Sequence, residues 1–373
     1  MICRDSGTHR HILMLRCLKM NTQVKHRRVR RADKRKRSVI VLVLLLCIGL
    51  FPVAATAQLP VIRISVETSG AQVQAHVVQR FAEQLAENLA GRYAVRFHDG
   101  ASLYRDADVF RALSMGRLEI AVPGSWHIGR HVPGVGLLAL PSLHGREATV
   151  YHALMESPVG AKMIGEIERT LDVHVLGRWI DLGHANLFTT VDTIRRPADI
   201  VGRTIQVALT RADELRIAAM GGIPATQEGN DLSKRLREGS TDTLLAAHET
   251  VVQARLWEHG IRAVYEDKQR FLQYVPICSG LFWDSLPPDV RQIIRETWDG
   301  MVDQARVAAE IAQGLVRSAL VAHGVSITMS GPLQIEQTRA LLVKEEARIV
   351  RTLGISDPLY RDFVSFMTGL DSP

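Results

Sequence analysis

The chain is poor in aromatic residues, which make up 5% of its 373 positions, and it has only four cysteines. So few cysteines exclude a disulfide scaffold. Cys3, Cys17 and Cys47 fall within the first 57 residues, which leaves Cys278 alone in the remainder. A single thiol makes neither an internal bridge nor a cysteine-based zinc site. Because Cys278 ends the apolar run that starts at Tyr274, we predict that it lies in a buried strand.

Motifs for common cofactors are also missing. No phosphate loop occurs, and Gly134–Ala139 lacks the third glycine of a dinucleotide fingerprint. His248-Glu249 is not followed by the second histidine of a zinc-protease helix. Ser125 and Ser279 lack the glycine pair that flanks an esterase nucleophile. We therefore expect no cofactor, no bound metal and no enzymatic activity.

The excess of positive charge is confined to one end. The formal net charge is +7, but residues 1–57 hold 13 Lys and Arg against two acids. The other 316 residues hold 33 basic and 37 acidic side chains, a net charge of −4. The main part of the chain therefore has no general affinity for nucleic acid. With 46% apolar residues, it is long enough for about two domains.

The basic segment belongs to an export signal. Arg27–Arg37 is followed by the apolar stretch Val39–Phe51, then by Pro52 and the small residues Ala55-Thr56-Ala57. This order predicts a signal peptide of residues 1–57, cleaved after Ala57, and hence a periplasmic protein. An uncleaved membrane anchor is the alternative, since the apolar stretch is nearly long enough to span a bilayer. The basic region is long, so Met14 or Met20 are alternative starts.

Beyond the signal, the pattern predicts an α/β fold. The alternation of apolar residues indicates strands at 61–66, 93–98 and 118–122, with helices at about 77–89 and 106–115 between them. Strands that alternate with helices form a parallel sheet. A second unit has strands at 187–190, 204–207 and 271–277 and helices at 211–220, 232–237 and 250–259. A long amphipathic helix covers 287–307 and extends to 322, and a last helix pair surrounds 335–353.

Four segments resemble those of a known family, the DctP-like solute-binding subunits of tripartite ATP-independent periplasmic (TRAP) transporters. The segments are Gly116–Val122, Gly136–Leu143, Pro197–Val207 and Phe282–Asp289, in the family's order between about Ile62 and Leu353. The resemblance implies a two-lobed periplasmic solute-binding fold with a long helix spanning both lobes. We assign residues 58–182 and about 272–311 to the first lobe. About 183–271 and 312–373 form the second.

The same resemblance implies the function. Family members close on a small solute and present it to a membrane permease, a hinge-type switch. A ligand drives closure by binding the closed state more tightly than the open one. We expect this chain to do the same, with TRAP-type permease subunits as its partners. The alternative is a ligand sensor of the same fold for a membrane signalling protein. An exported enzyme on a similar scaffold, which would need a reactive group in the cleft, and a paralogue without high-affinity binding are further alternatives.

Two positions depart from the family pattern. Most members carry an arginine that grips a substrate carboxylate where this chain has Gln206, and a second arginine where it has Ala185. A buried carboxylate without a cation is costly. We therefore expect a neutral polar solute, hydrogen-bonded by Gln206 and Asn186. Arg105 is the cation that could replace the missing pair.

Further candidates for the ligand site come from the ends of strands and from the first crossing between lobes. Trp126 could stack on a ring or a cation. Local capping or packing is the alternative for each of these residues. The full predicted set is Gln206, Asn186, His184, Arg105, Tyr104, Ser125, Trp126, Thr68 and Trp179.

Overall fold

A computed structural model describes residues 59–373, apart from positions 71, 192–193, 208–209, 227–231 and 372–373. The predicted signal peptide and its cleavage site after Ala57 lie outside the described residues. Within the described part, no helix combines the length and the apolar character needed to cross a membrane.

The first sheet has five strands in the order β2-β1-β3-β10-β4. β1 pairs in parallel with both β2 and β3, as the alternation of strands and helices predicts, whereas β10 runs antiparallel to β3 and β4. The amphipathic helix α2 buries Val78, Phe81 and Leu85 against this sheet. The elements are β1 (Val61–Ser65), α2 (Val73–Asn88), β2 (Ala94–His98), α3 (Asp106–Ser114), β3 (Ile120–Ala121), β4 (Val173–Val175) and β10 (Ile277–Ser279).

A group of helices links β3 to β4. Pro133, Pro141 and Pro158 each stand at the start of a helix, where a missing N–H costs nothing. The 3₁₀ helices are short and contain glycine or proline, whereas α6 is an amphipathic helix of 14 residues. The group comprises α4 (Ser125–Ile128), the 3₁₀ helices η1 (Pro133–Ala139) and η2 (Pro141–Leu143), α5 (Ala148–Glu156) and α6 (Pro158–Leu171).

The second sheet has six strands in the order β11-β9-β5-β8-β6-β7. β6 pairs in parallel with β7 and β8, while β5 runs antiparallel to β8 and β9. Its strands and helices are β5 (Ile180–Thr189), β6 (Thr204–Val207), α7 (Arg211–Ala219), β7 (Ile223–Ala225), α8 (Leu232–Arg237), β8 (Thr243–Ala247), α9 (His248–Gln253), β9 (Ala263–Tyr274) and β11 (Ser326–Met329). The 3₁₀ helices η3 (Pro197–Ile200) and η4 (Leu256–His259) lie in its connections.

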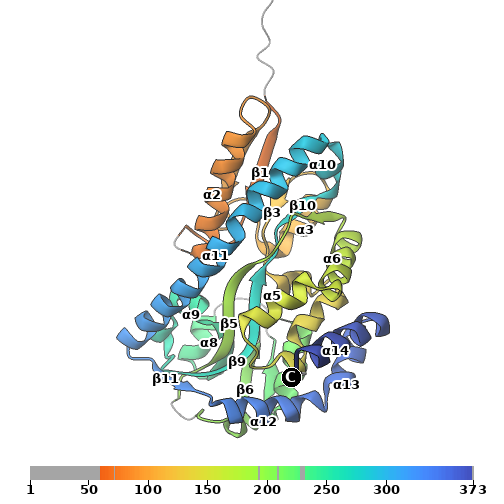
Figure 1. The fold of residues 1–373 in the computed structure, drawn as a ribbon. Coiled ribbons are helices and arrows are strands. Elements are labelled where there is room, and N and C mark those ends of the chain that lie inside the picture. Colours follow the sequence, from red (N-terminus) through yellow and green to blue (C-terminus); the bar gives the residue numbers. More distant parts are fainter. Residues whose placement is uncertain (1–58, 71, 192–193, 208–209, 227–231, 372–373) are drawn as a thin grey trace, which may run out of the picture. The chain divides into compact units, whose positions relative to one another are not determined.

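Three elements link the two sheets (Figure 1). β5 and β9 are the longest strands in the described part of the chain, which passes from β4 of the first sheet into β5 and from β9 into β10 of the first sheet. The helix α11 (Pro288–Ala322) packs on α2 near its start and on β5, α9 and β11 farther along. Trp298 of α11 meets Phe81 of α2 edge to face, with ring centroids 5.2 Å apart. This arrangement is the two-lobed α/β fold that the sequence predicts, while the residue boundaries of the lobes stay a prediction.

Several predicted elements differ in detail. The helix expected at 250–259 breaks at Arg255, which adopts a left-handed conformation between α9 and η4. The strand expected at 271–277 divides into β9 and β10 around Pro276, which has no N–H for a ladder. Cys278 lies in buried β10, as predicted. After α10 (Gly280–Ser285), α11 continues through residue 308 without interruption to Ala322.

The C-terminus adds one helix that the sequence pattern did not indicate. The predicted pair is α12 (Pro332–Val343) and α13 (Glu346–Leu353), and α14 (Asp357–Asp371) follows it. Phe363 of α14 is fully buried, and the helix lies against α6 and η1 (Figure 1). The C-terminal helices therefore pack on segments that precede β4, as well as on η2 and α7.

Candidate functional site

The loop that follows β1 in the first sheet contacts α9 of the second sheet. Thr68 follows β1, and its hydroxyl donates to Oε1 of Gln74, 2.6 Å away. Gln72 accepts a hydrogen bond from the backbone N–H of Ser69 at 3.1 Å. Gln253 of α9 donates to the same Gln72 oxygen at 2.8 Å. The predicted residue Thr68 therefore lies beside a contact between the loop after β1 and α9.

The short helix α4 places Ser125 and Trp126 at the same end. Ser125 is 1% exposed, and its Oγ has no hydrogen-bond partner among the described residues. Trp126 packs edge to face on Tyr274, with ring centroids 5.4 Å apart. Gly124 pairs with Tyr274 and lies so close to the indole that any side chain there would collide with it. In this structure the ring of Trp126 therefore packs against Gly124 and Tyr274.

Three titratable groups meet beside α4, and sequence reasoning missed all of them. One ligand-type atom each of Glu67, Asp106 and His127 lies within 4.8 Å of the others. Asp106 accepts from the backbone N–H of Gly124 at 3.1 Å, and Glu67 accepts from that of Asp106 at 2.8 Å. Because these carboxylates already bind backbone donors, we assign no metal to the group.

Burial dominates the electrostatics of this group. It raises the pKa of Asp106 from 3.8 to about 7, with the Glu67 carboxylate adding to the effect and the Gly124 N–H opposing it. It also lowers the pKa of His127 to about 4, helped by the nearby charge of Arg130. Both groups are therefore disposed to be uncharged at mildly acidic pH.

Tyr104 and Arg105 lie just before α3. Arg105 is the N-cap residue of that helix and is exposed to solvent. Tyr104 is partly buried and packs against the core around η1. The side chain of Arg105 therefore lies in solvent.

His184 and Asn186 occupy one face of β5. Asn186 accepts from the backbone N–H of Lys268 at 3.1 Å and donates to the carbonyl of His184 at 3.3 Å. His184 contacts the carbonyl of Arg146 through Nε2 at 3.0 Å, and burial lowers its pKa to about 4. Ala185 points to the opposite face because side chains alternate along a strand.

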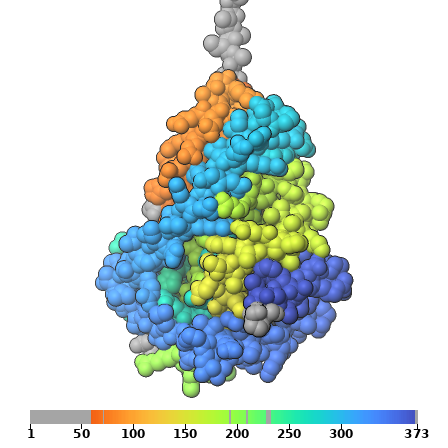
Figure 2. Space-filling model, viewed as in Figure 1, coloured from red at the N-terminus to blue at the C-terminus, as the bar shows by residue number. Residues whose placement is uncertain are grey.

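The face that carries His184 and Asn186 borders a cavity of about 950 Å³. Figure 2 shows it as a recess between α11 and α5. Glu266 on its border contacts Nε2 of His248 at 2.8 Å and forms an ion pair with Arg317 at 2.9 Å. Two of the nine predicted residues therefore share this cavity, and the other seven do not line it.

Gln206 and Trp179 are both buried. Gln206 is 5% exposed, and its Oε1 has no partner among the described residues. Trp179 is 1% exposed and belongs to the core cluster around α5 and α6, which makes it a packing residue in this structure. The structure thus does not bring the nine predicted residues together at one place.

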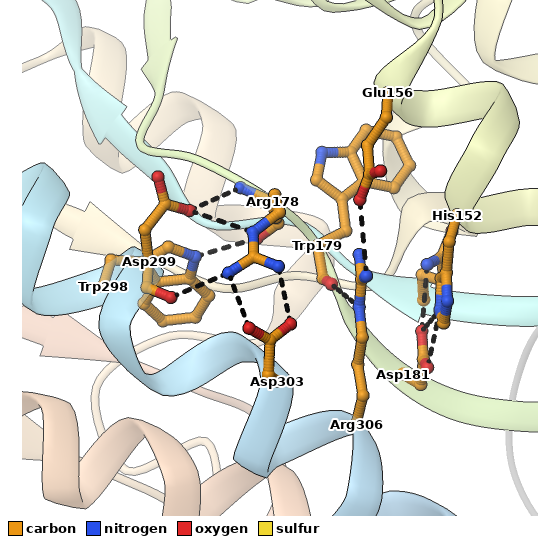
Figure 3. A network of polar contacts seen from close by, with 10 residues as sticks. His152, Glu156, Arg178, Trp179, Asp181, Trp298, Asp299, Asp303 and Arg306 are labelled. Carbon is orange, nitrogen blue, oxygen red and sulfur yellow. Dashed lines mark hydrogen bonds and ion pairs between the residues drawn. The ribbon is translucent and has the colours of Figure 1, made fainter. Parts of the chain in front are cut away.

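A polar network fixes the segment around Trp179 to the long helix (Figure 3). Arg178 donates to the carboxylate of Asp303 at 2.6 Å, and its carbonyl accepts from the indole of Trp298 at 2.9 Å. Arg306 donates to the carbonyl of Trp179 at 3.2 Å. The connection from β4 to β5 is therefore bonded to the middle of α11.

A second buried polar group was also missed from the sequence. It surrounds two arginines that are each 1% exposed, Arg216 on α7 and Arg270 on β9. Arg270 contacts Asp213 at 2.5 Å and the Thr210 hydroxyl at 3.1 Å. The alternation of side chains along a strand marks Arg270 as an inward position only once the bounds and register of the strand are known, so no separate sequence signal points to it.

Comparison with known proteins identifies the family. Residues 64–349 match the model of the DctP family, described as bacterial extracellular solute-binding protein, family 7. This chain belongs to the DctP family. The match covers both sheets, α11 and most of the helices around them.

Individual DctP relatives agree with this. A C4-dicarboxylate-binding periplasmic protein DctP of Shewanella loihica is 20% identical over 220 residues, which span 59% of this chain and 64% of that protein. The crystal structure of a TRAP periplasmic solute-binding protein from Ochrobactrum anthropi, whose C-terminus occupies its ligand-binding pocket, superimposes with a TM-score of 0.76. It is 17% identical and covers 84% of this chain and 96% of its own.

A second solved structure carries a small ligand. This TRAP periplasmic solute-binding protein from Ralstonia eutropha contains bound (S)-2-acetolactate and superimposes with a TM-score of 0.72. It is 19% identical and covers 83% of this chain and 99% of its own. At such identities the likeness shows the DctP fold alone.

Proposed function

We propose that this chain is an exported solute receptor, which captures a small molecule between its two lobes and delivers it to a TRAP-type membrane permease. The observation that carries the proposal is the arrangement of β5, β9 and α11. These elements connect the two sheets, while Gln72, in the loop after β1, contacts α9, and Gly129, just after α4, lies near Thr210 at the start of α7. Membership of the DctP family supports it. The role is binding and not catalysis, and the receptor acts in the periplasm.

Contacts between the lobes explain how a ligand would be sensed. Gln253 of α9 bonds to Gln72, and the N-terminal end of α7 lies against the end of α4. A solute that contacts both lobes binds the closed state better and shifts the population toward it.

We propose that the solute is an organic acid. The Shewanella relative is named for C4-dicarboxylates, and the Ralstonia structure holds 2-acetolactate, which is also a carboxylate. The neutral solute that Gln206 and Ala185 led us to expect has no support among these relatives. A cation must then come from elsewhere in the chain.

A thermal-shift screen tests the proposed function. The protein is exported, unfolded and refolded to remove bound ligand, then mixed with organic acids, amides, polyols and betaines. A ligand at about 100 times its Kd adds roughly 2.7 kcal/mol to the free energy of unfolding, which raises the melting temperature by a few degrees. If no compound of any class raises it, the receptor function is contradicted.

Export predicts a shortened chain. Because the signal peptide is expected to end at Ala57, the protein recovered from the periplasm should begin at Gln58. Intact-mass analysis measures this directly. A full-length mass in the membrane fraction would instead indicate an uncleaved anchor and would favour the sensor alternative.

Gln206 offers a test of the site predicted from sequence. Its Oε1 is buried without a partner among the described residues, so a hydroxyl group of a bound solute could donate a hydrogen bond to it. Gln206→Glu would place a negative charge there, and we expect it to remove the stabilisation by an acidic ligand. Melting curves with and without that ligand check this; an unchanged ligand response would exclude Gln206 from the site.

A further inference from the structure

Arg270, on β9 of the second sheet, projects from the face of the sheet opposite to the large cavity. A cation at this position can contribute to a separate binding site. In the β5–β9 ladder it stands directly opposite Ala185, so both side chains project from the same face. Phe271, which stands opposite His184, projects toward the cavity face. The small side chain of Ala185 leaves room for the guanidinium beside it.

A capping motif holds Arg270 in place. Thr210 is the N-cap residue of α7, and its N–H and hydroxyl both donate to Oδ2 of Asp213, at 3.0 and 2.6 Å. The guanidinium of Arg270 donates to the same oxygen at 2.5 Å and to the Thr210 hydroxyl at 3.1 Å. One end of Arg270 is therefore fixed by the N-terminus of α7.

Several polar atoms of this group have no hydrogen-bond partner among the described residues. An unpaired buried donor or acceptor costs roughly 1–3 kcal/mol, and native proteins leave few of them. All members of the set lie in residues at least nine-tenths buried. The unpaired atoms are Nε of Arg270, Nε of Arg216, Oδ1 of Asp213, Oδ1 of Asp267 and Nε2 of His144.

The charges at this place favour an anion. Arg216 and Arg270 share one nearby carboxylate, because Oδ1 of Asp213 is also 4.0 Å from Arg216. Asp267 bonds to Gln269, and burial raises its pKa to about 7, so much of it is uncharged at neutral pH.

The remaining acid near Arg216 is already engaged. Glu346 accepts from the N–H of Ser142 at 2.7 Å and from the hydroxyl of Tyr360 at 3.2 Å. Among the described residues, the hydrogen bonds of Arg216 go to the neutral partners His144 and Gln269, at 3.1 and 3.3 Å. Within this part of the chain, Nε of each arginine has no partner, and Asp213 is the carboxylate that pairs with both.

The group also lies where segments of the two sheets' domains meet. A Cβ built on Gly129, just after α4, would be 3.6 Å from the methyl group of Thr210. His144, which follows η2, bonds to Arg216 of α7. A ligand held by the arginines would therefore touch segments from both parts of the chain, as closure on a solute requires.

We propose that Arg270, held by Asp213 and Thr210, and Arg216 form the anion-binding centre of this receptor and take a carboxylate group of its solute. The inference rests on the proposed solute-receptor function. Guanidinium groups bind carboxylates through paired hydrogen bonds, which fills the unpaired donors described above. The centre supplies the cation that positions 185 and 206 lack, and it replaces Arg105 in that role.

Calorimetric titration of acids and their matched amides tests the centre. The probes are succinate, malate and lactate with succinamide, malamide and lactamide, added to ligand-stripped protein purified after export. The wild type should bind at least one acid and not its amide. The double variant Arg270→Gln/Asp213→Asn removes both charges together, and we expect it to bind that acid roughly 10- to 100-fold more weakly, as for loss of a hydrogen bond to a charged group.

Two further variants control for folding and for charge. Arg211→Gln removes an exposed arginine from the same helix and should leave binding unchanged. Arg216→Gln tests the centre independently if the double variant does not melt cooperatively. Binding of the acid within twofold of wild type by a folded variant, or binding of an amide as tightly as its acid, overturns the centre but leaves the receptor function standing. Failure of the wild type to bind any probe or any other solute contradicts the receptor function itself.

Discussion

Asp213→Ala should lower the free energy of unfolding by about 3–5 kcal/mol, the usual cost of leaving a buried charge without its partner. Asp213 and Arg270 are both almost completely buried, with their closest atoms 2.5 Å apart. The substitution also removes the cap at the start of α7, because Thr210 donates twice to the same carboxylate. Urea unfolding followed by circular dichroism measures the change.

An exposed ion pair provides the comparison for Asp213. Asp362 pairs with Lys162 on the surface, where both side chains are about half exposed. Asp362→Ala should change the free energy of unfolding by no more than about 1 kcal/mol, because solvent screens such pairs. If Asp213→Ala costs no more than Asp362→Ala, the buried network does not exist as described.

Asp106→Asn should make stability less sensitive to pH. Burial raises the pKa of Asp106 from 3.8 to about 7, so the folded protein holds a proton that the unfolded chain has lost in this range. The group therefore favours folding below about pH 4, and its contribution falls as the pH rises toward 7. Asparagine has no such penalty and can still accept from Gly124.

The expected size follows from the shift. Relative to wild type, the Asn variant should gain stability between pH 4 and pH 7, by up to about 4 kcal/mol at the upper end. His127 titrates in the same range but is present in both proteins, so its effect largely cancels in the difference. Urea midpoints at pH 4, 5.5, 7 and 8 measure it. Asp108→Asn, in an exposed position of the same helix, should show no such trend; a constant difference for Asp106→Asn would contradict the buried acid.

Most of the fold follows from local patterns in the sequence. The strands and helices of the first sheet repeat at spacings that mark one buried face, and the apolar stripe from Val290 to Val302 identifies α11. The exceptions have local causes. Arg255 has a positive φ, which few residues other than glycine adopt, and it ends the helical segment after α9. β10 has only three residues, so the amino-acid composition does not distinguish it from β9.

The candidate site was less accessible from the sequence because it depends on register. Position 270 becomes a neighbour of Ala185 only through the antiparallel pairing of β5 with β9, and that register contains a bulge between Ala185 and Leu187. One shift of register would turn Arg270 toward the other face. The sequence alone therefore shows that positions 185 and 206 lack arginine, but the nearest cation that it indicates is Arg105, which the structure leaves exposed.

The most direct test is a crystal structure of the protein with the carboxylate that stabilises it most in the screen. We predict that the carboxylate group lies within hydrogen-bond distance of the guanidiniums of Arg270 and Arg216, with the lobes closed around it. A ligand bound in the cavity beside His184 and Asn186, with both arginines paired as they are now, would contradict the account.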